Sequence, residues 1–367
     1  MREIRLAKEA GLKVVFVTRV ALEHGDEDNA YLWHGLIQPR DEATLDRWFE
    51  VYGDFVMRWA EVAEREGVDV FAVGSELNTL ASSTPTLAMP GLMGWYCDEA
   101  GRKADREAAL ADAPRIVPDG LAGHPGEVRA SFAEQLDAER AVHRGWAEAA
   151  LADCDEPDLV AVNRRRGLQL GHWRALIARV RSVYTGRLTY AANYDHYPEI
   201  GFWDQLDVIG VNAYFELWPI ELPLDADEPL DRHLREAWDE HLEDLDAFRH
   251  RRGLPDRPVL FTELGYTRRR HCSVHSWASA GYSLFGPADD RHVLVWRDEP
   301  VEDGERVAAM RALREVLDAR RDDELAPLVG GLLYWKLTTQ HSHAAAEPYS
   351  LVLGTGDPLE AELTAFR

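Results

Sequence analysis

Two glutamates, Glu76 and Glu263, stand at the ends of short apolar stretches, VDVFAV and PVLFT, in distant parts of the sequence. Two carboxyl groups acting on one bond can divide the chemistry, because one protonates the leaving oxygen while the other attacks carbon. Retaining glycoside hydrolysis uses such a pair, with the carboxyl groups about 5–5.5 Å apart. Taken singly, each glutamate could instead be an acid near a helix N-terminus. The occurrence of both favours hydrolysis.

Polar and aromatic residues also follow three further apolar stretches, which gives five such ends with the two that carry the glutamates. The ends are Gly74-Ser75-Glu76-Leu77-Asn78, Asn193-Tyr194-Asp195, Asn212-Ala213-Tyr214, Thr262-Glu263-Leu264-Gly265-Tyr266 and Tyr334-Trp335-Lys336. In a (β/α) barrel the C-terminal strand ends converge on one face, where active sites are found. We therefore expect these residues at one site, with the two glutamates facing each other across it.

Strands and helices alternate in the pattern that would position these ends. Apolar, β-branched runs predict buried parallel strands, at 13–18, 68–73, 188–192, 207–213, 258–263 and 330–335. Helical spacing of apolar residues predicts helices, at 41–66, 173–183, 232–249 and 306–320, with a short one near each end of the chain. Asp41 and Gly67 suit the start and the end of the first long helix. The alternation indicates a parallel sheet covered by helices, as a barrel or a doubly wound sheet.

Residues 81–167 break this alternation. The stretch is rich in Ala, Asp, Glu and Arg and is punctuated by Pro and Gly. It predicts a helical insertion, a lid or subdomain, with partial disorder as the alternative. The expected organisation is a barrel N-terminal part over 1–80, the insertion over 81–167 and a barrel C-terminal part over 168–367.

The composition of the chain limits the classes of molecule that it is expected to bind. The chain has 367 residues and a formal charge of −24, which argues against nucleic acid or an anionic membrane and suits a neutral substrate. Its three cysteines lie far apart, which indicates reduced thiols in a cytoplasmic protein. The start is too charged for a signal peptide, and no apolar run is long enough for a membrane helix. No cofactor is implied, and a homo-oligomer is one option.

Two weaker signals have ordinary explanations. His341-Ser342-His343 contains two histidines that could bind a metal, but without a third ligand nearby they are more typical of a loop beside the site. Arg164-Arg165-Arg166 is a basic run in an acidic protein, and it suits a solvated face or an internal ion pair.

The linked motifs resemble glycoside hydrolase family 113, the β-mannanase family of clan A, over roughly 1–80 and 168–367. The matching stretches are VDVFAVGSELN, HWRALIARVRSVYTGRLTYAANYD, FWDQLDVIGVNAYF, PVLFTELGYT and GGLLYWK. The resemblance implies a (β/α)8 TIM-type barrel and retaining hydrolysis of β-linked mannosides or related β-glycosides. Glu76 would be the general acid/base after strand four, and Glu263 the nucleophile after strand seven.

The same resemblance implies the residues around the two carboxylates. Tyr214 would hydrogen-bond the nucleophile and Trp335 would form the floor under the sugar. Asn193 and Asn212 would bind hydroxyl groups, with turn formation as the alternative for each. Asn78 and Tyr266 complete the expected substrate-binding set.

This sequence departs from the family pattern at two points. Ser75 precedes the acid/base where most of clan A has Asn, as small hydroxyl residues do in family 113. A single predicted strand, 13–18, precedes the one before Glu76, so the first two strand–helix units have no counterpart. Either the barrel starts upstream of Met1, or it is open, or the insertion or another chain fills the gap.

These departures leave two other functions open. One is a non-catalytic carbohydrate-binding or scaffold barrel, which would gain nothing from an intact carboxylate pair. The other is a β-glucosidase, β-galactosidase or transglycosylase of the same clan.

Overall fold

The structure, a computed structural model, describes residues 1–21, 34–87, 159–217, 230–274, 276–277, 282–285, 293–296, 300–321, 327–339, 342 and 348–366. These residues fall into two units. Unit 1 contains the described residues up to Val211, and unit 2 contains those from Asn212 onward. Each unit is described by itself.

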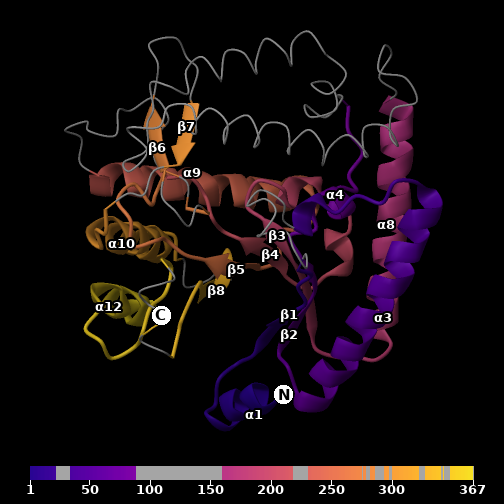
Figure 1. Ribbon diagram of the computed structural model, residues 1–367, viewed down its shortest axis with the longest axis horizontal. Coiled ribbons are helices and arrows are strands. Elements are labelled where there is room, and N and C mark those ends of the chain that lie inside the picture. Colours follow the sequence, from indigo (N-terminus) through magenta and orange to yellow (C-terminus); the bar gives the residue numbers. More distant parts are fainter. Residues whose placement is uncertain are drawn as a thin grey trace. The chain divides into compact units, whose positions relative to one another are not determined.

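Unit 1 is a parallel sheet with helices packed on it (Figure 1). Its strands are β1 Val15–Val17, β2 Val70–Ser75, β3 Arg187–Asn193 and, up to Val211, β4 Ile209–Asn212. Its helices are α1 Arg2–Glu9, α3 Glu42–Glu66, α4 Asn78–Ala81 and α8 Leu159–Arg181, with 3-10 turns η1 His34–Leu36, η3 Tyr197–Glu199 and η4 Trp203–Gln205. The strand order is β1-β2-β3-β4. β2 and β3 are almost wholly buried, as the apolar runs predict.

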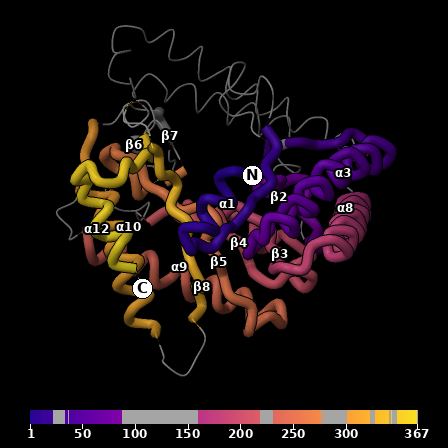
Figure 2. The backbone as a smooth tube through the Cα atoms, turned by 90° about the horizontal axis from the view of Figure 1, so that it is seen from below, coloured from indigo at the N-terminus to yellow at the C-terminus, as the bar shows by residue number. Residues whose placement is uncertain are grey.

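Helix α3 has the boundaries that its sequence predicts. The Asp41 side chain accepts the Thr44 backbone N–H at 2.8 Å in a capping box, and Gly67 ends the helix in the left-handed region at φ 67°. α3 and α8 lie side by side in both views of the backbone (Figures 1 and 2). They meet through Phe49 and Trp173, whose rings pack edge to face at 5.5 Å.

Helix α8 begins earlier than predicted. Its first residue, Leu159, lies inside the stretch assigned to the insertion. The buried face of the helix starts at Val162 and continues through Arg165, Arg166 and Gln169, and polar residues at these positions give no apolar periodicity. Residues 88–158, the bulk of the predicted insertion, lie outside the described residues.

Unit 2 contains a parallel strand pair, three helices and a hairpin. β5 Val259–Leu264 pairs with β8 Val329–Tyr334, and Val259 lies opposite Val329. The helices are α9 Leu230–Arg251, α10 Gly304–Ala319 and α12 Pro358–Ala365, and the antiparallel hairpin joins β6 Tyr282–Phe285 to β7 Val293–Trp296. α10 packs between α9 and α12. The hairpin was not predicted.

The end of β4 is tied to β5 within unit 2. The Ala213 backbone N–H donates to the Glu263 carbonyl oxygen at 2.7 Å. This bond places the residues that follow β4 beside the glutamate of β5.

The predicted strands and long helices are all present, and apart from the early start of α8 their ends are displaced by a few residues. In the described part of the chain, β1 is the one strand that precedes β2. Of the helices that the structure describes, none combines the length and apolar character of a membrane span.

Candidate active site

Glu76 stands at the C-terminal end of β2 in a strained backbone conformation. Its φ is +50°, in the left-handed region that costs a residue with a Cβ about 1–2 kcal/mol. The Glu76 N–H donates to the Ala191 carbonyl of β3 at 2.9 Å, next to a register shift between Ala72 and Ser75. The side chain is 16% exposed. Strain of this kind gathers at functional sites, because the surrounding structure must enforce it.

Aromatic side chains enforce the path of the chain into Glu76. A Cβ on Gly74 would lie 2.8 Å from the Tyr52 hydroxyl oxygen and 3.0 Å from a Tyr190 ring carbon, so only glycine fits there. The Tyr52 hydroxyl donates to the Val73 carbonyl at 2.8 Å, and the Leu77 N–H donates to the Tyr190 hydroxyl at 2.8 Å. Burial raises the pKa of both tyrosines, so they stay neutral. The backbone on either side of Glu76 is thereby fixed.

His34 is a site residue that the sequence did not reveal. It is 3% exposed, and its Nε2 lies 3.7 Å from Glu76 Oε2. Burial, and then the charge of Arg19, lowers the pKa of His34 to about 4, while a hydrogen bond with the Ser75 backbone opposes this. The imidazole is therefore neutral at ordinary pH. Because His34 is far from Glu76 in the sequence and belongs to no motif, its spacing does not predict that the two residues meet.

The two asparagines of unit 1 differ in what their side chains do. Asn78 is the first residue of α4, and its Oδ1 has no hydrogen-bond partner among the described residues. Asn193 ends β3, and its Oδ1 accepts the Tyr194 N–H at 3.0 Å. Asn193 thus makes the local turn bond that was its alternative, whereas the Asn78 oxygen is unused.

Glu263 lies in β5 and is half-buried. The Tyr214 hydroxyl donates to Glu263 Oε2 at 2.9 Å, the contact that the family resemblance implies. Tyr214 is 7% exposed and packs edge to face on Tyr349 at 6.2 Å. The Tyr349 hydroxyl in turn donates to the Ser276 carbonyl at 2.6 Å. The position of the Tyr214 hydroxyl is therefore set by packing as well as by its own bond.

Asn212 and Trp335 flank Glu263 along the strand ends. Asn212 is fully buried, and its Oδ1 accepts the Thr262 hydroxyl at 2.7 Å, which links the ends of β4 and β5. The Trp335 N–H donates to the Leu264 carbonyl at 2.8 Å, and Lys336 Nζ lies 5.5 Å from the centre of the Trp335 ring. A Cβ on Gly265 would overlap the Trp335 carbonyl oxygen.

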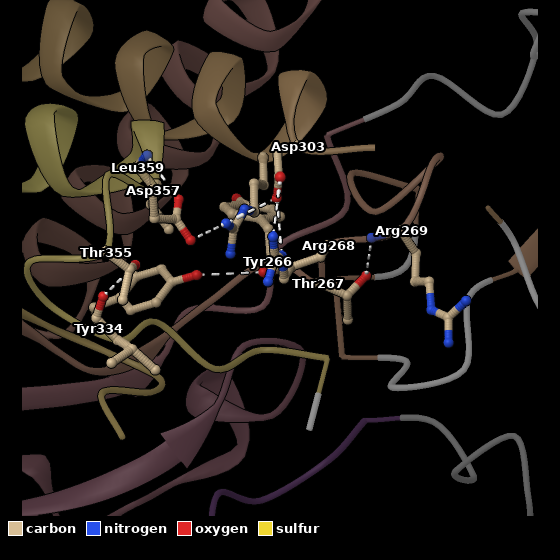
Figure 3. Close-up of polar contacts among 11 residues, drawn as sticks. Tyr266, Thr267, Arg268, Arg269, Asp303, Tyr334, Thr355, Asp357 and Leu359 are labelled. Carbon is tan, nitrogen blue, oxygen red and sulfur yellow. Dashed lines mark hydrogen bonds and ion pairs between the residues drawn. The ribbon is translucent and has the colours of Figure 1, made fainter. Parts of the chain in front are cut away.

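Tyr266 belongs to a network of polar contacts that follows the end of β5 (Figure 3). The Tyr334 hydroxyl donates to the Tyr266 carbonyl at 3.3 Å. The Tyr266 side chain is fully buried, and its hydroxyl has no partner among the described residues. Arg268 pairs with Asp303 at 3.1 Å in the same network. This burial gives Tyr266 a supporting position rather than the exposed one expected of a substrate ligand.

The structure describes part of the two weaker sequence motifs, the histidine pair and the arginine run. His341 and His343 lie outside the described residues. Arg165 and Arg166 are buried in α8, so a solvated face is wrong for them. Arg166 pairs with Glu199 at 2.6 Å, the internal ion pair that was the other option. Within the described ranges, no cluster of His, Cys, Asp and Glu side chains is arranged to hold a metal ion.

Each unit thus gathers its own set of predicted residues. Unit 1 places Glu76 and Asn78 at the end of β2, with Asn193 on the neighbouring strand end. Unit 2 gathers a larger set around the end of β5, namely Asn212, Tyr214, Glu263, Tyr266 and Trp335.

Three solved structures share the fold. The GH113 β-mannanase AaManA from Alicyclobacillus acidocaldarius, in complex with ManMIm, is 20% identical with a TM-score of 0.52, and the match covers 100% of this chain and 76% of that one. A GH113 β-1,4-mannanase gives 19% identity and a TM-score of 0.54, covering 99% and 77%. A complex of a GH113 β-1,4-mannanase gives 18% and 0.52, with 99% and 77% covered. These likenesses establish a TIM-like (β/α) fold.

The sequence itself matches one protein family. None of the curated proteins matches this chain. The model described as Glycoside Hydrolase Family 113 matches residues 1–85 and 148–291, which is more than half of the chain. The family match and the fold agree, and the chain belongs to glycoside hydrolase family 113.

Proposed function

We propose that this glycoside hydrolase cleaves β-linked mannosides, or closely related β-glycosides, with retention of configuration. Glu263 would attack the anomeric carbon while Glu76 protonates the leaving oxygen. Glu76 would then take a proton from the water that releases the sugar. The observation that carries this proposal is the half-buried Glu263 carboxylate at the end of β5, held by the Tyr214 hydroxyl at 2.9 Å.

The surroundings of Glu263 suit a nucleophile. The hydrogen bond from Tyr214 stabilises the ionised carboxylate, which is the form that attacks. The bond also fixes which oxygen is left to react, because Oε2 is the acceptor. Trp335, which follows the neighbouring β8, supplies an aromatic ring beside the same strand end. Such a ring suits the apolar face of a sugar.

The surroundings of Glu76 suit an acid/base. Its side chain is only 16% exposed, and burial favours the protonated form of a carboxyl group. The neutral His34 at 3.7 Å adds no positive charge that would oppose protonation. Asn78 stands two residues further on, and its side-chain oxygen is buried without a hydrogen-bond partner among the described residues, so a sugar hydroxyl that reached it would find an acceptor.

The relatives support a mannoside as the proposed substrate. The family-113 structures with this fold are β-mannanases by their descriptions. We therefore place β-1,4-linked manno-oligosaccharides first among the substrates, ahead of the corresponding glucosides and galactosides.

The experiment combines a substrate panel with azide rescue. Wild type, Glu76→Ala and Glu263→Ala are assayed on aryl β-mannosides, β-glucosides and β-galactosides and on manno-oligosaccharides. We expect both variants to lose at least about 1,000-fold in kcat, because each removes a group used in the chemical step. Azide should restore turnover of activated aryl mannosides and yield the α-mannosyl azide with Glu263→Ala and the β-mannosyl azide with Glu76→Ala.

Exposed carboxylates provide the controls. Glu50→Ala in α3 and Glu243→Ala in α9 remove side chains that are 63% and 69% exposed, and both should retain wild-type kcat. Turnover by Glu263→Ala at the wild-type rate would overturn the mechanism. Hydrolysis of β-glucosides in preference to β-mannosides would overturn the substrate assignment alone.

A further inference from the structure

We propose that His34 is a positioning residue for Glu76, which accepts a hydrogen bond from the protonated carboxyl group, and that Thr79 holds it in place. This inference rests on the proposed role of Glu76 as acid/base. It assigns functions to two residues outside the set that the sequence predicts.

The imidazole meets Glu76 with one nitrogen and the backbone with the other. His34 Nε2 lies 3.7 Å from Glu76 Oε2, and the ring also hydrogen-bonds with the Ser75 backbone. With Nε2 turned to Glu76, Nδ1 is the nitrogen left for Ser75. A backbone carbonyl only accepts, so Nδ1 carries the hydrogen and Nε2 presents its lone pair. A small closing movement brings Nε2 within hydrogen-bond distance of a protonated carboxyl oxygen.

The 3-10 turn that carries His34 is clamped to the helix that follows Glu76. The Thr79 hydroxyl lies 3.0 Å from the carbonyl of Gly35, which is part of η1, and 2.6 Å from the carbonyl of Ile37, which directly follows η1. The Thr79 carbonyl accepts the Gln169 amide of α8 at 2.8 Å. One residue thus joins η1, α4 and α8.

α8 supports this clamp with further side-chain donors to α4 and to the chain that follows η1. Arg165 donates to the Pro39 carbonyl at 2.6 Å, and Trp173 donates to the Leu80 carbonyl at 2.9 Å. Gln169 and Trp173 are 1% and 0% exposed. The donors therefore have no competing water, and the segments on both sides of the His34–Glu76 contact are fixed to one rigid helix.

The other charged and titratable groups around the contact act differently. Arg19, which follows β1, repels a proton on His34 and so keeps the imidazole in its accepting form. From β3, Tyr190 is buried, neutral and bonded to the Leu77 N–H. From α3, Tyr52 is neutral and bonded to Val73. Neither tyrosine offers a lone pair as basic as that of imidazole, so His34 is the group suited to retain the Glu76 proton.

The pH profile of kcat/KM tests the proposal. In His34→Phe the ring volume remains but the acceptor is lost, so the protonated Glu76 is held less well. The alkaline limb should move down by roughly one pH unit, with kcat reduced more than KM is changed. In His34→Gln the amide oxygen can accept, and most of the shift should be reversed. His250→Gln, which changes an exposed histidine of α9, should leave the profile unaltered.

Thr79 gives an independent pair of variants. Thr79→Val keeps the shape but removes the hydroxyl, and it should move the alkaline limb in the same direction as His34→Phe. Thr79→Ser restores the hydroxyl and should restore the limb. Folding is checked by circular dichroism and thermal melting. If His34→Phe does not fold, His34→Gln and the Thr79 pair carry the test.

Two results separate this inference from the proposed function. A wild-type alkaline limb in folded His34→Phe, or equal limbs in Thr79→Val and Thr79→Ser, would overturn the role of His34 while leaving Glu76 as acid/base. Wild-type turnover by Glu76→Ala would instead overturn the proposed function itself, because no acid/base would then need positioning.

Discussion

The Tyr214 hydroxyl donates a hydrogen bond of 2.9 Å to Glu263 Oε2. Tyr214 follows β4, and Glu263 lies in β5. The ends of these two strands are joined by the hydrogen bond from the Ala213 N–H to the Glu263 carbonyl. The distance between hydroxyl and carboxylate is therefore fixed by the sheet. Loss of the hydroxyl cannot be offset by a small shift of either residue.

Tyr214→Phe should lower kcat and move the acid limb of the pH–activity profile to higher pH. A hydrogen bond to a charged group is worth about 1.5–3 kcal/mol, and its loss makes the ionised Glu263 harder to form. We expect kcat to fall about 10- to 100-fold, measured on an aryl β-mannoside across the pH range. Tyr349→Phe, which keeps the ring against Tyr214, should leave the acid limb in place. An unshifted limb in Tyr214→Phe would remove this bond from the mechanism.

The backbone strain at Glu76 gives a stability prediction. Glu76→Ala and Glu76→Gly both delete the carboxylate, but only glycine relieves the positive φ of 50°. The glycine variant should therefore be more stable to unfolding than the alanine variant, by about 1 kcal/mol. Urea unfolding of the two proteins measures the difference, and both should be equally inactive.

The same pair of substitutions at Glu61 is the control for this prediction. In the middle of α3, Glu61→Gly should be less stable than Glu61→Ala by about 0.5–1 kcal/mol, because glycine weakens a regular helix. If Glu76→Gly and Glu76→Ala follow the order seen at Glu61, then φ at Glu76 is not positive in solution.

The sequence was sufficient for the strands of the parallel sheet and for the long helices, apart from the start of α8. Helical spacing and capping residues predicted α3, including its end at Gly67. The interactions that set its ends are made by residues close to those ends in the sequence. Glu263 and Tyr214 were predicted together because each directly follows an apolar run, and strand ends are where parallel sheets expose functional groups.

The supporting residues could not be predicted in the same way. His34 and Thr79 meet Glu76 through contacts between loops and a short helix, and no periodicity relates their positions. The prediction of a solvated face was wrong for Arg165 and Arg166. Charge alone does not reveal that their guanidinium groups donate to backbone carbonyls inside the fold. The burial of Asn212 and Tyr266 likewise depends on how neighbouring strand ends pack.

Gly265 provides a prediction about the floor residue. Any side chain there would collide with the Trp335 carbonyl oxygen, so Gly265→Ala must displace the chain that follows β8. We expect a loss of about 1–3 kcal/mol in the free energy of unfolding and a raised KM for manno-oligosaccharides. Gly330→Ala is the control: its Cβ would approach Pro258 only to 3.3 Å, and it should change KM little. Wild-type KM in Gly265→Ala would mean that Trp335 does not contact the sugar.

His196 should make the stability of the protein depend on pH. Its Nε2 lies 2.8 Å from the Ser82 hydroxyl, and burial, followed by the charge of Arg166, lowers its pKa to about 3. In the unfolded chain the pKa is near 6.5. Below that pH, His196 is protonated in the unfolded chain but stays neutral in the folded one. The contribution of His196 to the free energy of unfolding is therefore fully present above about pH 6.5 and decreases as the pH is lowered towards 3.

His196→Gln should flatten this dependence. Glutamine can keep a hydrogen bond to Ser82, and it does not titrate. Between pH 7 and pH 5 the wild type should lose about 2 kcal/mol more of its free energy of unfolding than the variant does, as measured by urea unfolding at both values. His34, whose pKa is lowered to about 4, contributes in the same direction in both proteins and so cancels in the comparison. If the two proteins lose equal stability over this range, His196 is protonated or exposed in the folded state, and its burial beside Ser82 is wrong.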